Sequence, residues 1–308
     1  ALGEKQLELI TRSDCAKLQA CIEKRGAFNV ADKTRTWLKQ IFSQAIARGL
    51  CEHNPASELH AIAIAPPPTQ HYPHLHEHEL PEFLRALSKT TSRLPARIAS
   101  WMTILTASRP GMVRYAKWEE IDFEEGIWTI PAARMKMRRD YVSPLPHQLI
   151  AMLTKLNQST GRSRYLFPGN GEKQPVISEN TINLVFAKIG YKGRLVSHGT
   201  RHTASTLLRE HGWLKDHVES QLAHVEGGIS GEYNQALYLP QRRIMMQWYA
   251  DYLDALKEGI TANLRDQFDT RVNQFLARPS APPLTASHAH KDDHLQKLPI
   301  ETDSTATQ

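Results

Sequence analysis

Apolar residues recur three and four positions apart along most of the chain, and this spacing predicts a mainly helical protein. The clearest example near the start is the stretch 31–48, which Gly49 ends. A weaker pattern of the same kind covers 7–24. These two segments predict a small, all-helical domain over residues 1–64.

Three consecutive prolines, at 66–68, interrupt this pattern. Proline cannot continue a helix and stiffens the chain, so we interpret 65–78 as a linker between two domains. The linker also holds four histidines, and His-x-His spacing is able to chelate a metal. No cysteine or carboxylate cluster with ligand spacing accompanies them, so we predict no metal site. The four residues are His71, His74, His76 and His78.

After the linker, helical patterns alternate with short segments that are typical of strands. Amphipathic helices are predicted over 80–87 and 97–108, the second ending where Pro110 and Gly111 turn the chain. This places Arg109 at the junction between a helix and a turn.

Three short strands are predicted next. Two of them, 121–123 and 127–130, flank Glu124-Glu125-Gly126 and predict a hairpin. The pair Tyr141-Val142 adds a third strand. Together they predict a small antiparallel sheet.

The rest of the chain returns to helical spacing and then loses it. A second domain, over 79–258, therefore combines helices with the small sheet. From about residue 265 the composition turns to Pro, Ser, Thr, His and Asp, which predicts that 259–308 is a largely disordered tail. Further helices are predicted over 146–157, 179–188, 200–210, 215–222 and 241–256.

Composition supports two domains and narrows the class of partner. With 308 residues and 41% apolar content, the chain is long enough for each domain to bury a core of its own. The formal net charge of +6 favours a polyanionic partner, although the same balance suits an ordinary solvated surface. The 3 cysteines have no metal spacing and cannot all pair, which suits a reducing cytoplasm. No stretch reaches the roughly 20 apolar residues that a membrane span requires.

The residues that carry chemistry form an ordered set along the second domain. Two arginines can clamp a phosphate, a lysine can protonate a leaving oxygen, two histidines can bond phosphate oxygens, and a tyrosine can attack phosphorus. These are the residue types needed to break and rejoin a DNA backbone. A His-x-x-Arg pair alone is a common accident in a chain with 15 histidines, but the ordered set is not. It runs Arg109, Lys136, His198, Arg201, His224 and Tyr233.

Lys136 lies between the second and third predicted strands, on a basic connection. Arg134, Arg138 and Arg139 share this connection and are predicted to bind DNA. A flexible ammonium in such a place can reach a phosphate. A solvated basic turn is the other interpretation of the same residues.

The segments around these positions resemble those of the tyrosine recombinase (phage integrase) family, and most of all the integrases of satellite phages and genomic islands. The resemblance extends from about residue 30 to about residue 257, which is most of the chain. The segments that carry it are Leu105-Thr-Ala-Ser-Arg-Pro-Gly111, Ile127-Trp-Thr-Ile-Pro131 leading into Arg134-Met-Lys-Met-Arg138, Ser197-His-Gly-Thr-Arg201, and Gln221-Leu-Ala-His224 followed by Glu232-Tyr-Asn234.

The resemblance implies a two-domain fold, with a helical core-binding domain before an α+β catalytic domain, and another DNA-binding domain upstream. It also implies that Tyr233 forms a 3′-phosphotyrosyl intermediate, which a 5′-hydroxyl then resolves. Covalency retains the bond energy, so neither nucleotide nor metal cofactor is expected. Tyr238 and Tyr249 are rivals for the nucleophile, but Tyr238 lies five residues beyond the expected spacing and Tyr249 lies within a helix.

The function that the resemblance implies is the integration or excision of a mobile element by site-specific DNA recombination. The expected partners are double-stranded DNA attachment sites, further copies of the chain in a homotetramer on DNA, and accessory DNA-bending or excision factors. The expected location is the cytoplasm, at the bacterial nucleoid.

One position departs from the family pattern, because Met112 stands where the family usually has Glu or Asp. In the family this acid supports basic neighbours by hydrogen bonds, so we expect a looser site that still works, with Glu119 or Glu120 as candidate replacements. Two alternatives stay open. One is a DNA-binding or architectural protein of the same fold with weakened catalysis, and the other is a type IB topoisomerase-like activity.

Overall fold

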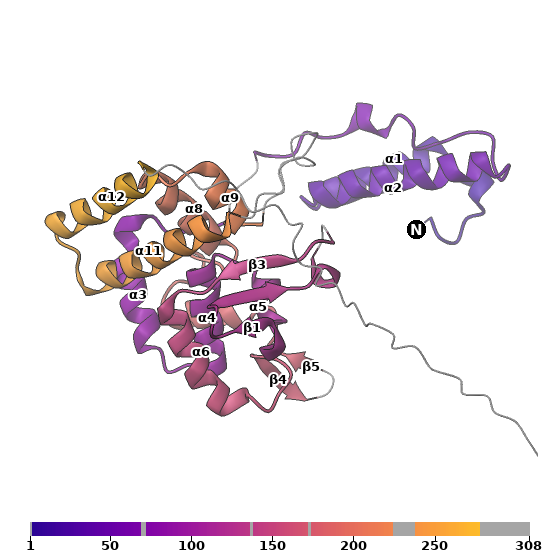
Figure 1. The fold of residues 1–308 in the computed structure, drawn as a ribbon. Coiled ribbons are helices and arrows are strands. Elements are labelled where there is room, and N and C mark those ends of the chain that lie inside the picture. Colours follow the sequence, from indigo (N-terminus) through magenta and orange to yellow (C-terminus); the bar gives the residue numbers. More distant parts are fainter. Residues whose placement is uncertain (1, 69–71, 136–137, 172–173, 224–237, 278–308) are drawn as a thin grey trace, which may run out of the picture. The chain divides into compact units, whose positions relative to one another are not determined.

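The structure, a computed structural model, describes residues 2–68, 72–135, 138–171, 174–223 and 238–277. The chain divides into two compact units, Ala1–His71 and Tyr72–Gln308 (Figure 1). The boundary between them falls within the segment that the prolines predict to be a linker. Helices make up most of the described residues in both units, which confirms the prediction of a mainly helical protein.

The first unit is built on two helices that pack against each other, α1 (Arg12–Glu23) and α2 (Phe28–Ala47). Short 3-10 turns, η1 (Leu7–Leu9) and η2 (Leu59–Ile62), complete its regular structure among the described residues. Both predicted helices are therefore confirmed. Their small shared core consists of Cys15, Phe42, Ala56 and Leu59.

Only part of the apolar face of α2 reaches this core. Phe42 and Ala45 are buried, whereas Trp37 and Ile41 are more than half exposed. The apolar spacing thus predicted the helix correctly, but it did not tell which apolar residues the unit buries.

The second unit surrounds one buried helix with other helices. That helix, α4 (Leu94–Thr106), is buried at every residue from Ile98 onward and packs against α5, α6, α7, α8 and α11. The other α-helices of the unit among the described residues are α3 (Leu80–Lys89), α5 (Pro110–Arg114), α6 (His147–Thr160), α7 (Thr181–Lys188), α8 (Gly199–Glu210), α9 (Lys215–Gln221), α11 (Leu239–Glu258) and α12 (Ala262–Leu276). Its 3-10 turns are η3 (Glu77–Glu79), η4 (Trp118–Glu120) and η5 (Ala132–Arg134).

The predicted antiparallel sheet is present, in the order β1 (Ile121–Asp122), β2 (Ile127–Ile130) and β3 (Tyr141–Pro144). Trp128 pairs with Ile121 on one side and with Ser143 on the other. Its indole is fully buried, so the sheet contributes one face to the core around α4.

A second, two-stranded sheet was not predicted. It pairs β4 (Pro168–Gly171) with β5 (Gln174–Val176) in antiparallel register. These strands contain proline and glycine, which are depleted in strands, so the local sequence carries little strand signal.

Three expectations need correction, and the first concerns Pro110. Pro110 does not simply turn the chain but opens α5, because its fixed φ suits the first turn of a helix and its missing N–H is not needed there. Arg109 is the residue before this helix, and its carbonyl accepts from the amides of Met112 and Val113.

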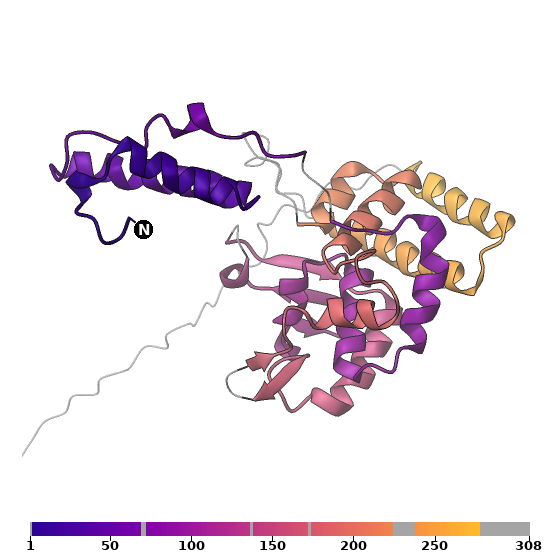
Figure 2. The ribbon, with the colours of Figure 1, turned by 180° about the vertical axis from the view of Figure 1, so that it is seen from behind.

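The second correction concerns the predicted tail. Residues 262–276 form α12, which lies beside α11 in Figure 1 and in the reverse view of Figure 2. Phe268 and Val272 are buried, and the Trp248 indole of α11 donates to the Phe268 carbonyl (3.0 Å). The apolar residues of α12 recur at helical spacing, which the bias toward polar residues in this region concealed. Residues 278–308 lie outside the described residues.

The third correction concerns the end of the predicted linker, because residues 73–75 pack on α8 and Glu77 contacts α11 and α12. The Thr203 hydroxyl donates to the Leu75 carbonyl (2.9 Å), and the Leu75 amide donates to the same hydroxyl (3.0 Å). A Cβ on Gly199 would lie 1.9 Å from the Pro73 carbonyl oxygen, so this contact requires glycine. Leu75 is itself buried, and the segment belongs to the second unit.

Candidate active site

Arg201 is a buried arginine in the first turn of α8. Its two terminal nitrogens donate to the Ala107 carbonyl (2.7 Å) and to the Leu222 carbonyl (2.6 Å). His198 is the residue immediately before the helix, as the sequence predicts. Burial is the main cause that lowers the pKa of Arg201 to about 10, and the positive charge of Arg109 adds to it.

Arg109 approaches the same place from the turn between α4 and α5. Its Nη2 donates to the Ala223 carbonyl (3.2 Å). The structure therefore brings the two predicted arginines together, although they are far apart in the sequence. Two guanidiniums that share one place repel each other, and an anion bound between them would relieve this repulsion.

The carbonyls that hold these arginines come from the C-terminal ends of α4 and α9. Ala107 follows α4 and Ala223 follows α9, and both adopt a left-handed conformation, with φ of 49° and 48°. The last carbonyls of a helix have no partner inside the helix, and they carry the negative end of its dipole. Two helix ends thus stabilise the guanidiniums with neutral oxygens.

His198 lies beside other aromatic rings. The centroid of its ring is 4.5 Å from that of Tyr72 and 6.5 Å from that of His202. His202 is in turn 5.6 Å from His74, and His74 is 5.3 Å from His76. Two histidines of the predicted linker, His74 and His76, therefore lie near the start of α8, whereas His71 lies outside the described residues. Among the residues that the structure describes, no group of three or more His, Cys, Asp and Glu side chains could hold a metal ion.

Three of the predicted catalytic residues, Lys136, His224 and Tyr233, lie outside the described residues. One of the rival tyrosines is placed unambiguously: Tyr249 is fully buried in α11, and burial raises its pKa, which argues against it as a nucleophile. Tyr238 is half-buried at the start of α11, where its ring centroid is 5.0 Å from that of His217.

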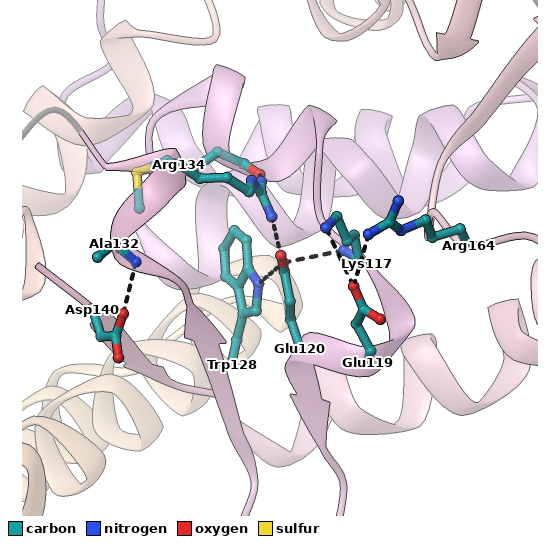
Figure 3. A network of polar contacts seen from close by, with 9 residues as sticks. Lys117, Glu119, Glu120, Trp128, Ala132, Arg134, Asp140 and Arg164 are labelled. Carbon is teal, nitrogen blue, oxygen red and sulfur yellow. Dashed lines mark hydrogen bonds and ion pairs between the residues drawn. The ribbon is translucent and has the colours of Figure 1, made fainter. Parts of the chain in front are cut away.

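The predicted DNA-contacting arginines of the β2–β3 connection differ in their surroundings. Arg138 and Arg139 are exposed. Arg134 instead forms an ion pair with the buried carboxylate of Glu120 and donates to the Met112 carbonyl (3.0 Å), as Figure 3 shows for the ion pair. Its guanidinium is thus engaged inside the unit, which does not favour a direct contact with DNA.

Glu120 holds several groups in place at once. Besides Arg134, its carboxylate accepts from the Trp128 indole (3.1 Å) and from the Lys117 amide (3.2 Å), as drawn in Figure 3. Glu119 is exposed and pairs with Lys117 (3.2 Å). Of the two candidate replacements for the acid missing at position 112, only Glu120 is buried, and its arginine partner reaches the backbone of Met112.

Sequence reasoning missed three residues that complete the site: Tyr141, Gln221 and Arg242. The Tyr141 hydroxyl donates to the Gln221 carbonyl, and Arg242 of α11 donates to the Gln221 side chain (3.0 Å). A signal for Arg242 was present, because it lies at helical spacing from the buried residues Met245 and Tyr249. A charged residue on the apolar face of a helix needs polar partners, so its position indicates a buried polar network.

Comparison with known proteins matches both units of the chain. The model of the phage integrase family matches residues 73–239, and that of the phage integrase central domain matches residues 1–62. The integrase of Shigella phage Sf6 is 40% identical over 234 residues, which are 75% of this chain and 60% of that protein. The prophage integrase IntS of Escherichia coli strain K12 has the same identity and coverage. The chain thus spans about 60% of the length of these curated relatives.

Solved structures show the same fold. A lambda integrase (75-356) dimer bound to a COC' core site superposes with a TM-score of 0.56 at 19% identity, over 75% of this chain and 82% of that one. The Tn1549 transposon integrase (aa 82-397) in complex with circular intermediate DNA also superposes with a TM-score of 0.56, at 15% identity, over 74% of this chain and 81% of that one. No helix in the described part of the chain is long and apolar enough to cross a membrane.

Proposed function

We propose that this chain, which belongs to the phage integrase family, is part of a site-specific recombinase that cuts and rejoins DNA through a phosphotyrosyl intermediate. The observation that carries the proposal is the pairing of Arg109 and Arg201 at the ends of α4 and α9. Backbone carbonyls at adjacent positions hold both guanidiniums. Such preorganised donors suit the nonbridging oxygens of a phosphodiester, where negative charge builds during displacement.

In this mechanism the phenolic oxygen of Tyr233 attacks phosphorus, and the bond from phosphorus to the 5′-oxygen breaks. Lys136 gives a proton to the departing oxygen as general acid, while His198 accepts the phenolic proton. His224 supports a phosphate oxygen by a hydrogen bond. A 5′-hydroxyl of a partner strand then attacks the phosphotyrosine and releases the tyrosine. Neither a nucleotide nor a metal ion takes part.

The partner is double-stranded DNA that carries an attachment site of a mobile element. Lambda integrase, which shares the fold, is known as a dimer on a core site and as a tetramer on a Holliday junction. By analogy, a homotetramer on DNA carries out the exchange here, in the cytoplasm at the nucleoid and with accessory DNA-bending or excision factors. Arg138 and Arg139, both exposed, contribute to DNA binding.

The replacement of Tyr233 by Phe tests the proposal, because it removes only the phenolic oxygen. On a suicide substrate, a nicked duplex from which the cleaved strand diffuses away, Tyr233→Phe should form no covalent adduct while it binds the duplex as well as the parent. Tyr238→Phe is the matched control and should keep the adduct. An adduct with Phe at 233, or its loss with Phe at 238, would overturn the assignment.

A strand-transfer assay with two attachment sites separates this function from the alternatives. A recombinase exchanges strands between the sites, a topoisomerase-like enzyme only relaxes supercoils, and a weakened binder does neither. The ion pair of Glu120 with Arg134, which reaches the Met112 backbone, supports an active enzyme despite the missing acid.

A further inference from the structure

Arg242 is a charged residue in the core of the second unit. Its side chain is 0% exposed, and burial lowers its pKa. Its Nε donates to the Gln221 side-chain oxygen (3.0 Å), and its Nη2 donates to the Tyr141 hydroxyl (3.0 Å) and to the Val142 carbonyl (2.8 Å). The guanidinium carbon also lies 5.2 Å from the centre of the Tyr141 ring. Arg242 thus links α11 to β3 and to the end of α9.

Gln221, the last residue of α9, connects these elements further. Its side-chain nitrogen donates to the Thr106 carbonyl at the end of α4 (2.8 Å) and to the Ser143 hydroxyl of β3 (3.1 Å). Its backbone carbonyl accepts from the Tyr141 hydroxyl. Both ends of the Gln221 amide and its backbone oxygen are therefore used, and its side chain can adopt only one position.

This network continues directly into the arginine pair. The carbonyls of Gln221, Leu222 and Ala223 are consecutive, and they accept from Tyr141, Arg201 and Arg109 respectively. A shift in the end of α9 would therefore move the oxygens that hold both catalytic arginines. The network sets their geometry without touching a phosphate itself.

Stability alone does not explain a buried arginine at this position. Removing a guanidinium from water costs several kcal/mol, and apolar residues of similar volume are often as stabilising as a buried charge, or more so. What an apolar residue cannot supply is a fixed set of donors directed at two elements. The fork of the guanidinium does this, and its planar shape limits the positions of Gln221 and Tyr141.

We propose that Arg242 is a positioning residue for DNA cleavage, which acts through Gln221 and Tyr141 on the end of α9 that holds Arg201 and Arg109. This inference rests on the proposed function. It assigns a role in the geometry of the site to a residue of α11 that is distant in sequence from both arginines.

The test compares Arg242→Met and Tyr141→Phe with the parent protein. Tyr141→Phe removes only the hydroxyl between Arg242 and the Gln221 carbonyl, so it keeps the proposal testable if Arg242→Met does not fold. Single-turnover cleavage of the suicide substrate should slow by about 10- to 100-fold, an estimate borrowed from groups that orient metal ligands. Equilibrium binding of the duplex should stay within about 2-fold of the parent, because no phosphate contact is lost.

Arg243→Met is the matched control. Arg243 follows Arg242 in α11 but is partly exposed, and it pairs with Glu125 (3.2 Å). This variant should cleave at the parental rate. Arg242→Lys should remain slow, because one ammonium cannot replace the donors on Nε and Nη2.

A double-mutant cycle separates positioning from a general loss of stability. If the Tyr141 hydroxyl acts through Arg201, Tyr141→Phe should slow the parent but add little to the loss already caused by Arg201→Lys. Additive losses, or parental rates in both Tyr141→Phe and Arg242→Met, would overturn the positioning role. If the parent itself forms no adduct on a verified attachment site, the proposed function fails and the positioning role fails with it.

Discussion

Two arginine sites in the second unit differ in the atoms that hold the guanidinium. At the ends of α4 and α9, Arg109 and Arg201 donate to backbone carbonyls. Beside β2, Arg134 pairs with the carboxylate of Glu120. A carbonyl orients a guanidinium but leaves its net charge in place, whereas a carboxylate neutralises it. Arg109 and Arg201 also repel each other, and we propose that this repulsion favours an anion at the first site, whereas the ion pair at the second site holds the protein together.

This difference also ranks the basic residues that the sequence alone treats alike. Arg134 and Arg138 lie on the same connection, but only Arg134 has a buried acid as its partner. The role that fits Arg134 is to join the start of the β2–β3 connection to the backbone of α5. We propose that it thereby supports the region of Lys136 without contacting DNA.

The largest effect should come from changing an arginine held by carbonyls. In Arg201→Lys, a single ammonium cannot donate to Ala107 and Leu222 and also contact a phosphate through two parallel bonds. Single-turnover cleavage should fall by roughly 10²-fold or more. Arg138→Lys, at an exposed position, is the control and should change cleavage little. If cleavage falls equally in Arg201→Lys and Arg138→Lys, the arginine held by carbonyls has no larger role in cleavage than an exposed one.

A smaller effect, on stability more than on chemistry, is expected when the carboxylate-held site is changed. Glu120→Gln keeps the shape of the side chain but removes the charge that pairs with Arg134, and its amide has to face donors from Trp128 and Lys117. The free energy of unfolding should fall by about 1–3 kcal/mol in urea titrations. The exposed Glu119→Gln serves as control and should stay within about 0.5 kcal/mol of the parent. If Glu120→Gln leaves the free energy of unfolding unchanged, the structural role of Glu120 is contradicted.

The smallest effect should appear in the response to pH, at a third arginine site. Glu77 pairs with Arg265 and accepts from the Tyr252 hydroxyl (2.6 Å), and His211 lies between Glu77 (3.4 Å) and Asp269 (2.5 Å). The hydrogen bond with His211 is the main cause that lowers the pKa of Glu77 from 4.5 to about 2. The bonds with both carboxylates raise the pKa of His211 above its usual value of 6.5, against the opposing effect of burial.

The signs of these two shifts define a pH window. The contribution of Glu77 is fully present above pH 4.5 and is lost as the pH falls toward 2. The contribution of His211 is fully present below pH 6.5 and is lost as the pH rises through its raised pKa. The stability difference between the parent and Glu77→Gln should therefore be largest between these limits. Glu4→Gln, at an exposed position, is the control. If the difference in stability does not shrink toward pH 2, the assignment is contradicted, because the Glu77 carboxylate loses its charge in this range.

The sequence by itself predicted most of the elements and indicated the family. Apolar spacing predicted the main helices and alternation predicted the three-stranded sheet, because both patterns depend on which face of a local element is buried. The order of residues from Arg109 to Tyr233 likewise indicated the family. Residue spacing and residue order are properties of the sequence itself, so they can be found without the structure.

Only the tertiary structure decided how the site is held. Arg109, Arg201 and Arg242 come from three different elements, and they are joined by the carbonyls at the end of α9 and by the side chain of Gln221. Every residue has a backbone carbonyl, so the sequence does not show which carbonyl accepts a hydrogen bond from a given arginine. The partner of a buried arginine depends on which helix ends meet in the core. For the same reason, spacing could not separate Arg134, which is paired with Glu120, from its exposed neighbours. The sequence determines the chemistry of these residues, whereas packing determines which donors and acceptors hold them in place.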